Sequence, residues 1–124
     1  MIHRWKRLAE LIGSEKIHTD LATRLIFSHD ASSYRIVPEV VVAPTSIDDV
    51  KSILWFANQT STSLCFRAAG TSLSGQSLTE GIVVNLMHQS EWDWTSINES
   101  SSLVSAGPAS IAGNINAQLR KHHK

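Results

Sequence analysis

A single cysteine, a zero net charge and the lack of long apolar runs narrow the interpretation of this 124-residue sequence. Cys65 alone cannot form an internal disulfide, which fits a reducing compartment better than secretion. The 11 Lys and Arg residues balance 11 Asp and Glu residues, so no general field favours nucleic acid or an anionic membrane. Apolar runs such as residues 40–43 are far shorter than the about 20 residues that a membrane span needs. The first residues lack the apolar core of a signal peptide, so we expect a soluble, cytoplasmic protein.

The composition is that of an ordinary globular domain, with 42% apolar and 18% charged residues. Residues 2–12 carry apolar side chains at helical spacing, and Gly13 follows where a helix commonly ends. A shorter helix is expected over residues 19–28, with Asp20 as an acidic residue in its first turn. In the turn after it, we expect Asp30 to hydrogen-bond the local backbone. The apolar residues that define the two helices are Ile2, Trp5, Leu8, Leu11, Ile12, Leu21, Leu25 and Ile26.

The middle of the chain predicts a strand–helix–strand unit. Residues 39–43 form a β-branched run without alternation, which is typical of a strand covered on both faces. Ser46 is a favourable N-cap for a helix that extends to about residue 58. Residues 64–66 then predict a buried strand with Cys65 as a packing thiol, parallel to the first strand through a right-handed crossover. The apolar helix face is assigned to Ile47, Val50, Ile53, Leu54 and Ala57.

The last third predicts another strand, a hairpin and a helix. Residues 82–86, which are apolar except for Asn85, predict the third strand of the core. Trp92 and Trp94 alternate with polar residues, which indicates a strand with one buried face, followed by a turn at 98–101 and a returning strand at 103–106. The predicted fold is therefore α/β, with a small parallel βαβ core, a hairpin and flanking helices. The final helix is marked by Ile111, Ile115 and Leu119.

The most informative segment is the ten-residue stretch that follows the second predicted strand. It has two glycines, several hydroxyl side chains and little bulk, so its backbone can approach an anion and direct N–H groups at it. It also leaves the C-terminal end of a parallel strand, where open α/β sheets bind ligands. These features predict a phosphate-binding loop, although a polar turn without a ligand has the same composition. Its residues are Arg67, Ala68, Ala69, Gly70, Thr71, Ser72, Leu73, Ser74, Gly75 and Gln76.

Two common phosphate-binding motifs do not fit this loop. A Walker A loop needs a lysine before its final hydroxyl residue, but this chain has Gln76 before Ser77, and no acidic strand like Walker B follows. The dinucleotide fingerprint G-x-G-x-x-G is absent, because Gly70 and Gly75 are five residues apart and Gly81 lies six residues further on. Two interpretations remain: a loop that neutralises a pyrophosphate with backbone N–H groups and hydroxyls instead of a lysine, and a polar turn without a ligand.

This segment resembles the pyrophosphate-binding loop of FAD-linked oxidases and dehydrogenases of the p-cresol methylhydroxylase/vanillyl-alcohol oxidase type. It is close to the RAAGTSLSGQ form of bacterial D-lactate dehydrogenase-like and glycolate oxidase-like flavoproteins. Residues 29–38 are similar to their D-A-S-x-Y-R-x-x-P segment, residues 40–50 to V-V-x-P-x-S-x-x-D-V, and residues 81–86 to G-I-V-V-x-L. The collinear similarity extends over about residues 29–120, which makes it more specific than any one motif.

The resemblance implies FAD as the cofactor, with its pyrophosphate held by residues 67–76. Arg67 would either contact the cofactor or make a structural hydrogen bond at the strand end. Ala68 and Ala69 replace glycines of the commoner R-G-G-G-T form, so the resemblance requires a negative φ at both positions. The favoured backbone or hydroxyl contacts are Gly70, Thr71, Ser72 and Gly75.

The fold implied is the first lobe of a PCMH-type FAD-binding domain. Residues 1–28 would form an N-terminal helical segment, and residues 29–124 the first part of the domain, truncated before its second half. The function implied is the FAD-binding portion of a flavin-dependent D-2-hydroxy acid dehydrogenase, of the D-lactate, glycolate or 2-hydroxyglutarate class. Its small 2-hydroxy acid and the iron–sulfur cluster of some members would bind downstream of Lys124. We therefore assign no catalytic and no metal-binding residue, and expect the 124-residue chain to be inactive.

Two alternatives stay open for the function. The chain could be a non-catalytic remnant that folds without holding FAD firmly, or a free-standing module that binds a small nucleotide or another anion. We predict neither a nucleic-acid partner nor a membrane span, whereas the full-length setting leaves open a peripheral position at the inner membrane. Truncation would leave apolar surface uncovered, which predicts self-association.

Overall fold

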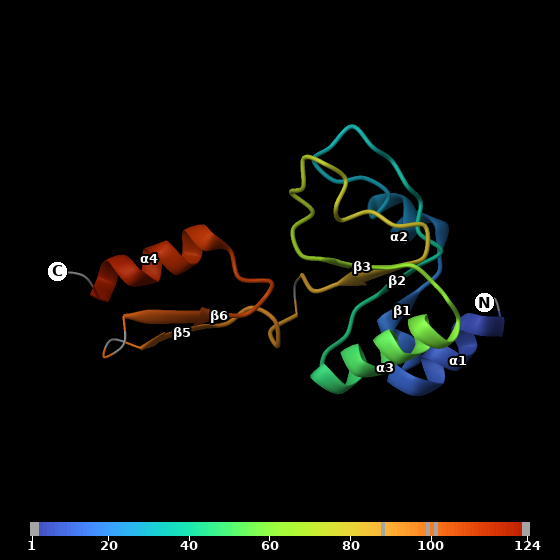
Figure 1. The fold of residues 1–124 in the computed structure, drawn as a ribbon, viewed down its shortest axis with the longest axis horizontal. Coiled ribbons are helices and arrows are strands. Elements are labelled where there is room, and N and C mark those ends of the chain that lie inside the picture. The colour runs from blue at the N-terminus through green and yellow to red at the C-terminus, as the bar shows by residue number, and fades with distance from the viewer. Residues whose placement is uncertain (1–2, 88, 99, 101, 123–124) are drawn as a thin grey trace.

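A computed structural model describes residues 3–87, 89–98, 100 and 102–122. The main body is an α/β unit around a four-stranded sheet, and a hairpin with a helix extends from it as a second, smaller part (Figure 1). The predicted α/β class, with parallel strands and a hairpin, is confirmed. The elements are α1 (His3–Ile12), η1 (Ser14–Lys16), β1 (Ile17–His18), α2 (Leu21–Ile26), β2 (Val40–Val42), α3 (Ile47–Gln59), β3 (Leu64–Arg67), β4 (Ile82–Asn85), β5 (Thr95–Asn98), β6 (Leu103–Ala106) and α4 (Ala112–His122).

The strand order of the sheet is β1-β2-β4-β3. Strands β2, β4 and β3 are parallel as predicted, whereas the two-residue β1, which the sequence analysis missed, joins β2 antiparallel. The two strands of the strand–helix–strand unit are not neighbours, because β4 lies between them. Burial agrees with this order. The central strand β4 has Ile82, Val83 and Val84 fully buried, whereas Phe66 in the edge strand β3 is 42% exposed. The prediction that residues 64–66 form a buried strand is therefore wrong, since β3 is an edge strand and Cys65 is only half-buried.

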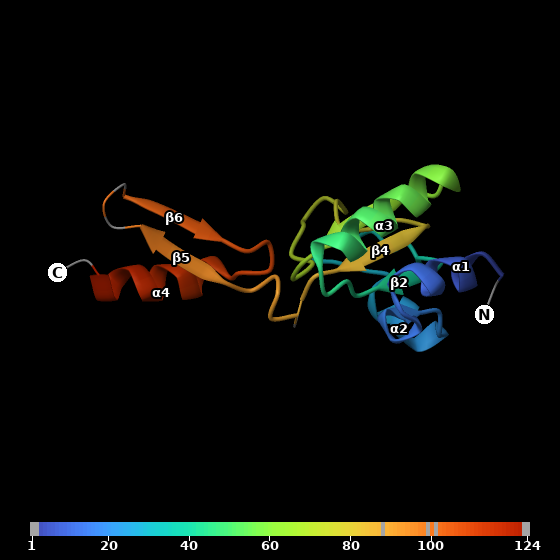
Figure 2. The same cartoon turned by 90° about the horizontal axis from the view of Figure 1, so that it is seen from below.

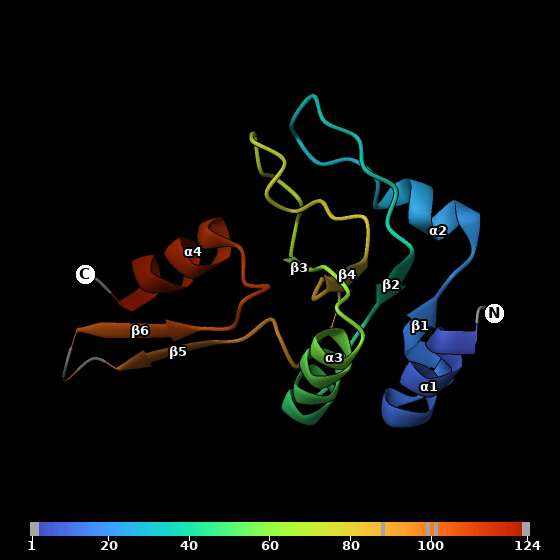
Figure 3. The ribbon, with the colours of Figure 1, turned by 45° about the vertical axis from the view of Figure 1, so that its right-hand side comes forward.

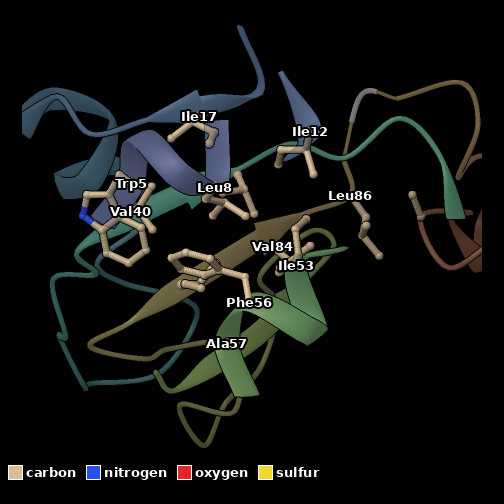
Figure 4. Close-up of a cluster of buried hydrophobic side chains, with 13 residues drawn as sticks. Trp5, Leu8, Ile12, Ile17, Val40, Ile53, Phe56, Ala57, Val84 and Leu86 are labelled. Atoms are coloured by element: carbon tan, nitrogen blue, oxygen red, sulfur yellow. The ribbon is translucent and has the colours of Figure 1, made fainter. Parts of the chain in front are cut away.

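Helices α1 and α3 cover one face of the sheet, and α2 lies on the other side (Figure 3). The rings of Trp5 and Phe56 meet between α1 and α3 with centroids 6.0 Å apart. Because strand side chains alternate between faces, Val41 and Val83 are buried on the side of α2 and the long loops. The division of the chain at residue 28 stays a prediction. The buried cluster on the helix side, most of it labelled in Figure 4, contains Trp5, Leu8, Ile12, Ile17, Val40, Val42, Ile53, Phe56, Ala57, Ile82, Val84, Leu86 and Ala109.

Local capping signals place the helix ends close to their predicted positions. Gly13 adopts φ +97° directly after α1 and donates its N–H to the carbonyl oxygen of Ala9. Asp20 caps α2 by accepting a 2.8 Å hydrogen bond from the N–H of Thr23, and Ser46 caps α3 through the N–H of Asp49. These side chains satisfy N–H groups that a helix leaves free at its first turn.

The buried faces of α2 and α3 differ from the prediction. In α3, Ile47 and Leu54 are exposed, and the face that packs on the sheet includes Phe56 instead. Phe56 turns inward because α1 supplies Trp5 as a partner, which no periodicity within α3 can indicate. The predicted apolar side of α2 is wrong as well, since Leu21 and Ile26 are both more than 60% exposed.

The hairpin of β5 and β6, with α4 beside it, lies beyond the end of the main sheet (Figure 2). Its first strand starts at Thr95, so the prediction that Trp92 and Trp94 belong to a strand is wrong. Trp92 instead packs against the main core. The predicted turn at 98–101 lies partly outside the described residues, and within it Asn98 Oδ1 accepts a hydrogen bond from the N–H of Ser100. The final helix is confirmed, with Ile115 and Leu119 half-buried and Ile111 exposed before its start.

Candidate functional site

Residues 68–76 begin the irregular segment that leaves the C-terminal end of β3. Because β2, β3 and β4 are parallel, this loop lies at the edge of the sheet where all three strands end. It runs beside the loop between α2 and β2, and both rise on the side of the sheet opposite α1 and α3 (Figure 3). The N–H of Ala31 joins the two loops by donating a 3.2 Å hydrogen bond to the carbonyl oxygen of Gly70. Of the ten predicted site residues, Arg67 is the last residue of β3 and the other nine follow it in the loop.

Several backbone N–H groups of this loop are available to a ligand. In the part of the chain that the structure describes, no hydrogen bond is donated by the N–H groups of residues 68–73. Backbone N–H groups are obligatory donors that normally find a partner. Consecutive unpaired donors in a loop form the kind of concave site that binds phosphate oxygens. Thr71 and Leu73 lie exposed in this stretch, whereas the Arg67 guanidinium packs against Gly70.

The two glycines of the loop adopt conformations that other residues avoid. Gly70 has φ +67° and Gly75 has φ +75°. A Cβ atom at Gly70 would overlap the guanidinium of Arg67, and one at Gly75 would lie 3.0 Å from Cδ2 of Tyr34. The glycines are therefore required both by their backbone conformation and by neighbouring side chains. Positive φ at non-glycine residues is confined, among the described residues, to Ser61 and Ser102, so Ala68 and Ala69 have the negative φ that was expected.

Ser72 organises the second half of the loop. Its Oγ accepts hydrogen bonds from the N–H groups of Ser74 and Gln76, at 3.2 and 3.1 Å, and donates to Gln76 Oε1 at 3.3 Å. Leu78 closes the turn by donating its N–H to the carbonyl oxygen of Gly75. The hydroxyl of Ser72 therefore shapes the loop from within.

Arg67 anchors the first half of the loop. Its Nη1 donates to the carbonyl oxygens of His29 and Phe27, at 2.8 and 3.3 Å, and its guanidinium carbon lies 5.1 Å from the centroid of the Phe27 ring. Burial lowers the pKa of Arg67, although the nearby charge of Asp30 opposes the shift. These are structural hydrogen bonds of the kind considered for Arg67, and its contact with a cofactor stays a prediction.

A surface pocket of about 230 Å³ lies between the start of the loop and the end of α2. Sequence reasoning did not nominate its residues outside the loop. Asn85 gave the one available signal, because it is a polar residue at the end of an otherwise apolar parallel strand. Its Oδ1 accepts a 3.1 Å hydrogen bond from the N–H of Met87. The pocket is lined by Ile26, Phe27, Arg67, Ala68, Ala69, Asn85 and Met87.

Cys65 lies beneath the far end of the loop. Its Sγ donates to the carbonyl oxygen of Gln76 at 3.0 Å, and burial raises the pKa of the thiol. A thiol with a raised pKa is a poor nucleophile, which fits the packing role expected for it. Within the described ranges, no three His, Cys, Asp or Glu side chains lie close enough together to hold a metal ion. Nor does any helix in the described part of the chain have the length and apolar character needed to cross a membrane.

A comparison with known proteins gives one family match and several similar proteins. The family model described as "FAD binding domain" matches residues 38–124. D-2-hydroxyglutarate dehydrogenase of Pseudomonas putida is 32% identical over 110 residues, which cover 86% of this chain and 11% of that protein. The glycolate oxidase subunit GlcD of Bacillus subtilis is 32% identical over 83 residues, covering 65% of this chain and 18% of the subunit. The chain thus spans between 7% and 18% of the length of the curated relatives that it matches.

Solved structures with a similar fold include three enzymes whose chains are about four times as long as this one. p-Cresol methylhydroxylase with substrate bound matches with a TM-score of 0.77 and 10% identity, over 98% of this chain and 25% of its own. Alkyldihydroxyacetonephosphate synthase matches with a TM-score of 0.74 and 12% identity, and the match covers 98% of this chain and 26% of the synthase chain. 4-Ethylphenol oxidase from Gulosibacter chungangensis matches with a TM-score of 0.72 and 19% identity. This match covers 98% of this chain and 25% of the oxidase chain. At these identities the likeness concerns the fold alone.

Proposed function

This chain belongs to the FAD binding domain family, and from that premise we propose that residues 67–76 hold the pyrophosphate of FAD. The family resemblance and the PCMH-type fold expected from the sequence are both confirmed. The observation that carries the proposal for the loop is the run of N–H groups at residues 68–73 that have no partner among the described residues. The left-handed glycines, Gly70 and Gly75, keep this backbone open to a closely approaching anion.

The chain's own groups would bind the pyrophosphate mainly through dipoles. The loop contains no lysine, and Arg67 directs its Nη1 at two carbonyl oxygens. Hydrogen bonds from backbone N–H groups to a charged acceptor are shorter and stronger than neutral ones, so several of them can replace a lysine. When bound, FAD supplies the capacity to accept a hydride, and this loop serves to hold and orient it.

Competition between ligand fragments tests this assignment. FAD is titrated into the purified chain by calorimetry, and the titration is repeated with ADP, inorganic pyrophosphate or riboflavin present in excess. A pyrophosphate-binding loop predicts that ADP and pyrophosphate weaken FAD binding while riboflavin has no effect. Competition by riboflavin alone, or an absence of FAD binding, would remove the proposal and favour the remnant hypothesis.

For the whole protein we propose flavin-dependent oxidation of a D-2-hydroxy acid. The support is the naming of two relatives as D-2-hydroxyglutarate dehydrogenase and glycolate oxidase subunit. This chain contributes cofactor binding, with residues 29–124 as part of the FAD-binding domain and residues 1–28 as a helical segment before it. We assign none of its side chains to substrate chemistry.

A dye-reduction assay tests this second proposal. The 124-residue chain, supplied with FAD and D-lactate, glycolate or D-2-hydroxyglutarate, is expected to give no turnover. A longer protein that contains this chain is expected to oxidise at least one of the three. Turnover that purifies with the 124-residue chain would contradict the assignment, as would a longer protein that is inactive on all three acids.

We also propose that the chain associates with a second copy of itself through the hairpin part. Leu103, Val104 and Trp94 are between 38% and 64% exposed there, and Ile111 is 51% exposed beside them. A net charge of zero supplies no repulsion between copies.

A further inference from the structure

We propose that Asp30 is a positioning residue for the cofactor, which fixes the shape of the 67–76 loop through a brace formed by residues 27–34. This inference rests on the proposed function, because it concerns how the same loop is prepared for a pyrophosphate. It adds residues that lie between 38 and 47 positions from the loop positions they contact.

Each carboxylate oxygen of Asp30 accepts one hydrogen bond, one within the brace and one from the residue that follows the loop. Oδ1 accepts a 2.9 Å hydrogen bond from the N–H of Ser32, which closes the turn within the brace. Oδ2 accepts a 2.9 Å hydrogen bond from Ser77 Oγ, directly after the loop. Ser77 is buried and Asp30 is partly exposed, so water reaches this bond from the side of Asp30 only. Hydrogen bonds from Ser32 and then Ser77 lower the pKa of Asp30 to about 2, and the carboxylate is ionised at neutral pH.

The brace also holds the near end and the middle of the loop. Arg67 donates to the carbonyl oxygens of Phe27 and His29, and Ala31 donates its N–H to the carbonyl oxygen of Gly70. The guanidinium of Arg67 occupies the space that a side chain at Gly70 would need. The first glycine therefore leaves room for a group that ties the brace to the loop.

Tyr34 makes the corresponding contact at the second glycine. Its ring lies against Gly75, where an added Cβ would come within 3.0 Å of Cδ2. The N–H of Tyr34 donates to Ser32 Oγ, so the ring is attached to the turn that Asp30 closes. Both glycines thus face side chains that belong to the brace or are held by it. These contacts join two segments that are separate in sequence.

The charge of Asp30 argues for a role through hydrogen bonds alone. A carboxylate near a pyrophosphate site repels the ligand, so its charge cannot favour FAD binding. The Asp30 side chain instead supports the loop by accepting two hydrogen bonds. An asparagine can keep both, because it can accept from the N–H of Ser32 and donate to Ser77 Oγ. The Asp30→Asn variant should consequently bind FAD at least as tightly as the parent, whereas Asp30→Ala should not.

The experiment compares Asp30→Ala, Asp30→Asn and Ser77→Ala, with Asp20→Ala as a matched control. Asp20 also accepts a backbone hydrogen bond in its own turn, but it caps α2 and does not touch the loop. We expect Asp30→Ala and Ser77→Ala to weaken FAD binding about tenfold each, and the double variant no more than Asp30→Ala, because both single variants remove the hydrogen bond between Asp30 and Ser77. Asp30→Asn and Asp20→Ala should stay within about threefold of the parent. Equal weakening in Asp30→Ala and Asp20→Ala would overturn the proposal, since general destabilisation would then explain both.

Amide hydrogen exchange without FAD separates this inference from the proposed function. The amides of Ser74, Gln76 and Leu78 are hydrogen-bonded within or just after the loop, and Asp30→Ala should speed their exchange while β4 amides stay unchanged. Unchanged loop exchange overturns the brace, whether or not FAD binds. Faster exchange with unaltered FAD affinity overturns its role for the cofactor. If the parent binds no FAD, the proposed function fails, and faster loop exchange still supports the brace.

Discussion

The indole N–H of Trp92 donates a 2.7 Å hydrogen bond to the carbonyl oxygen of Pro44. Pro44 lies just after β2 and is fully buried, whereas Trp92 stands at the start of the hairpin part. The ring of Trp92 also packs against the main core, and its carbonyl oxygen accepts the N–H of Ala109 at 2.9 Å. One residue therefore connects the end of the sheet, the hairpin and the segment before α4.

Replacing Trp92 by phenylalanine tests this connection. The variant keeps an aromatic ring but leaves the buried carbonyl oxygen of Pro44 without its donor, which should lower the free energy of unfolding by about 1–3 kcal/mol. Trp94→Phe is the matched control, because Trp94 is 47% exposed, and its effect should stay within about 0.5 kcal/mol. Urea denaturation measures both. Similar losses in the two variants would mean that the hydrogen bond contributes nothing.

Gly70→Ala should weaken FAD binding about tenfold or more. The left-handed φ of Gly70 penalises a side chain, and the added Cβ displaces the guanidinium of Arg67 from its carbonyl partners. Gly113→Ala in α4 is the control, since its Cβ would meet nothing within 4 Å. That variant should bind FAD like the parent and gain slightly in stability from helix propensity. Calorimetric titration measures the FAD affinity of both variants. Equal affinities of Gly70→Ala and Gly113→Ala would contradict the assignment of the loop.

Leu8→Ala should lower the free energy of unfolding of the whole main body by about 2–5 kcal/mol. Leu8 is 0% exposed in the cluster between α1, α3 and the sheet, whereas Leu73 is 80% exposed in the loop. Leu73→Ala, with the same change in side chain, should stay within about 0.5 kcal/mol of the parent. If Leu8→Ala gave a separate early transition and left the main transition unchanged, α1 would be an independent unit instead of part of this core.

The ion pair of Lys16 and Asp49 predicts a loss of stability in acid. Lys16 Nζ lies 2.8 Å from Asp49 Oδ2, which also accepts the N–H of Thr45 at 2.8 Å. Burial alone would raise the pKa of Asp49, but the hydrogen bonds from Lys16 and Thr45 outweigh it and hold the pKa below its ordinary value of 3.8. Because the folded-state pKa is lowered, the stabilisation is fully present well above pH 3.8 and is lost as the pH falls through the folded value.

Urea denaturation of the parent and of Asp49→Asn at pH 7 and pH 3 measures this effect. The parent should be more stable than Asp49→Asn at pH 7, and the difference should narrow at pH 3. A difference that widens at pH 3 would show that the carboxylate destabilises the fold when ionised.

Self-association through the hairpin predicts a concentration-dependent sedimentation coefficient. Val104→Lys, on β6, places a charge on the exposed strand and should shift the chain towards the monomer. Ile47→Lys adds the same charge at a 66% exposed position on α3, in the main body, and should leave association unchanged. An equal effect of both variants would indicate a general influence of charge and not an interface at the hairpin.

Local sequence patterns determined those features that depend on neighbours along the chain. The β-branched residues of β2 predict a strand covered on both faces, and Val40, Val41 and Val42 are all buried. Ser46 and Gly13 marked helix ends through hydrogen bonds and backbone conformations that involve only a few residues. The small residues of the 67–76 loop likewise indicated a backbone that can approach an anion.

Tertiary structure alone decided which segments far apart in sequence meet. The central position of β4, the inward turn of Phe56 and the role of Trp92 each depend on a partner from another element. The hydrogen bond between Asp30 and Ser77 spans 47 positions, and the one between Arg67 and Phe27 spans 40. Periodicity and propensity report the environment within about one helix turn or strand, so they carry no information on such partners. The chain's own residues therefore specified a loop suited to an anion, while the packing of two distant segments decided how that loop is held.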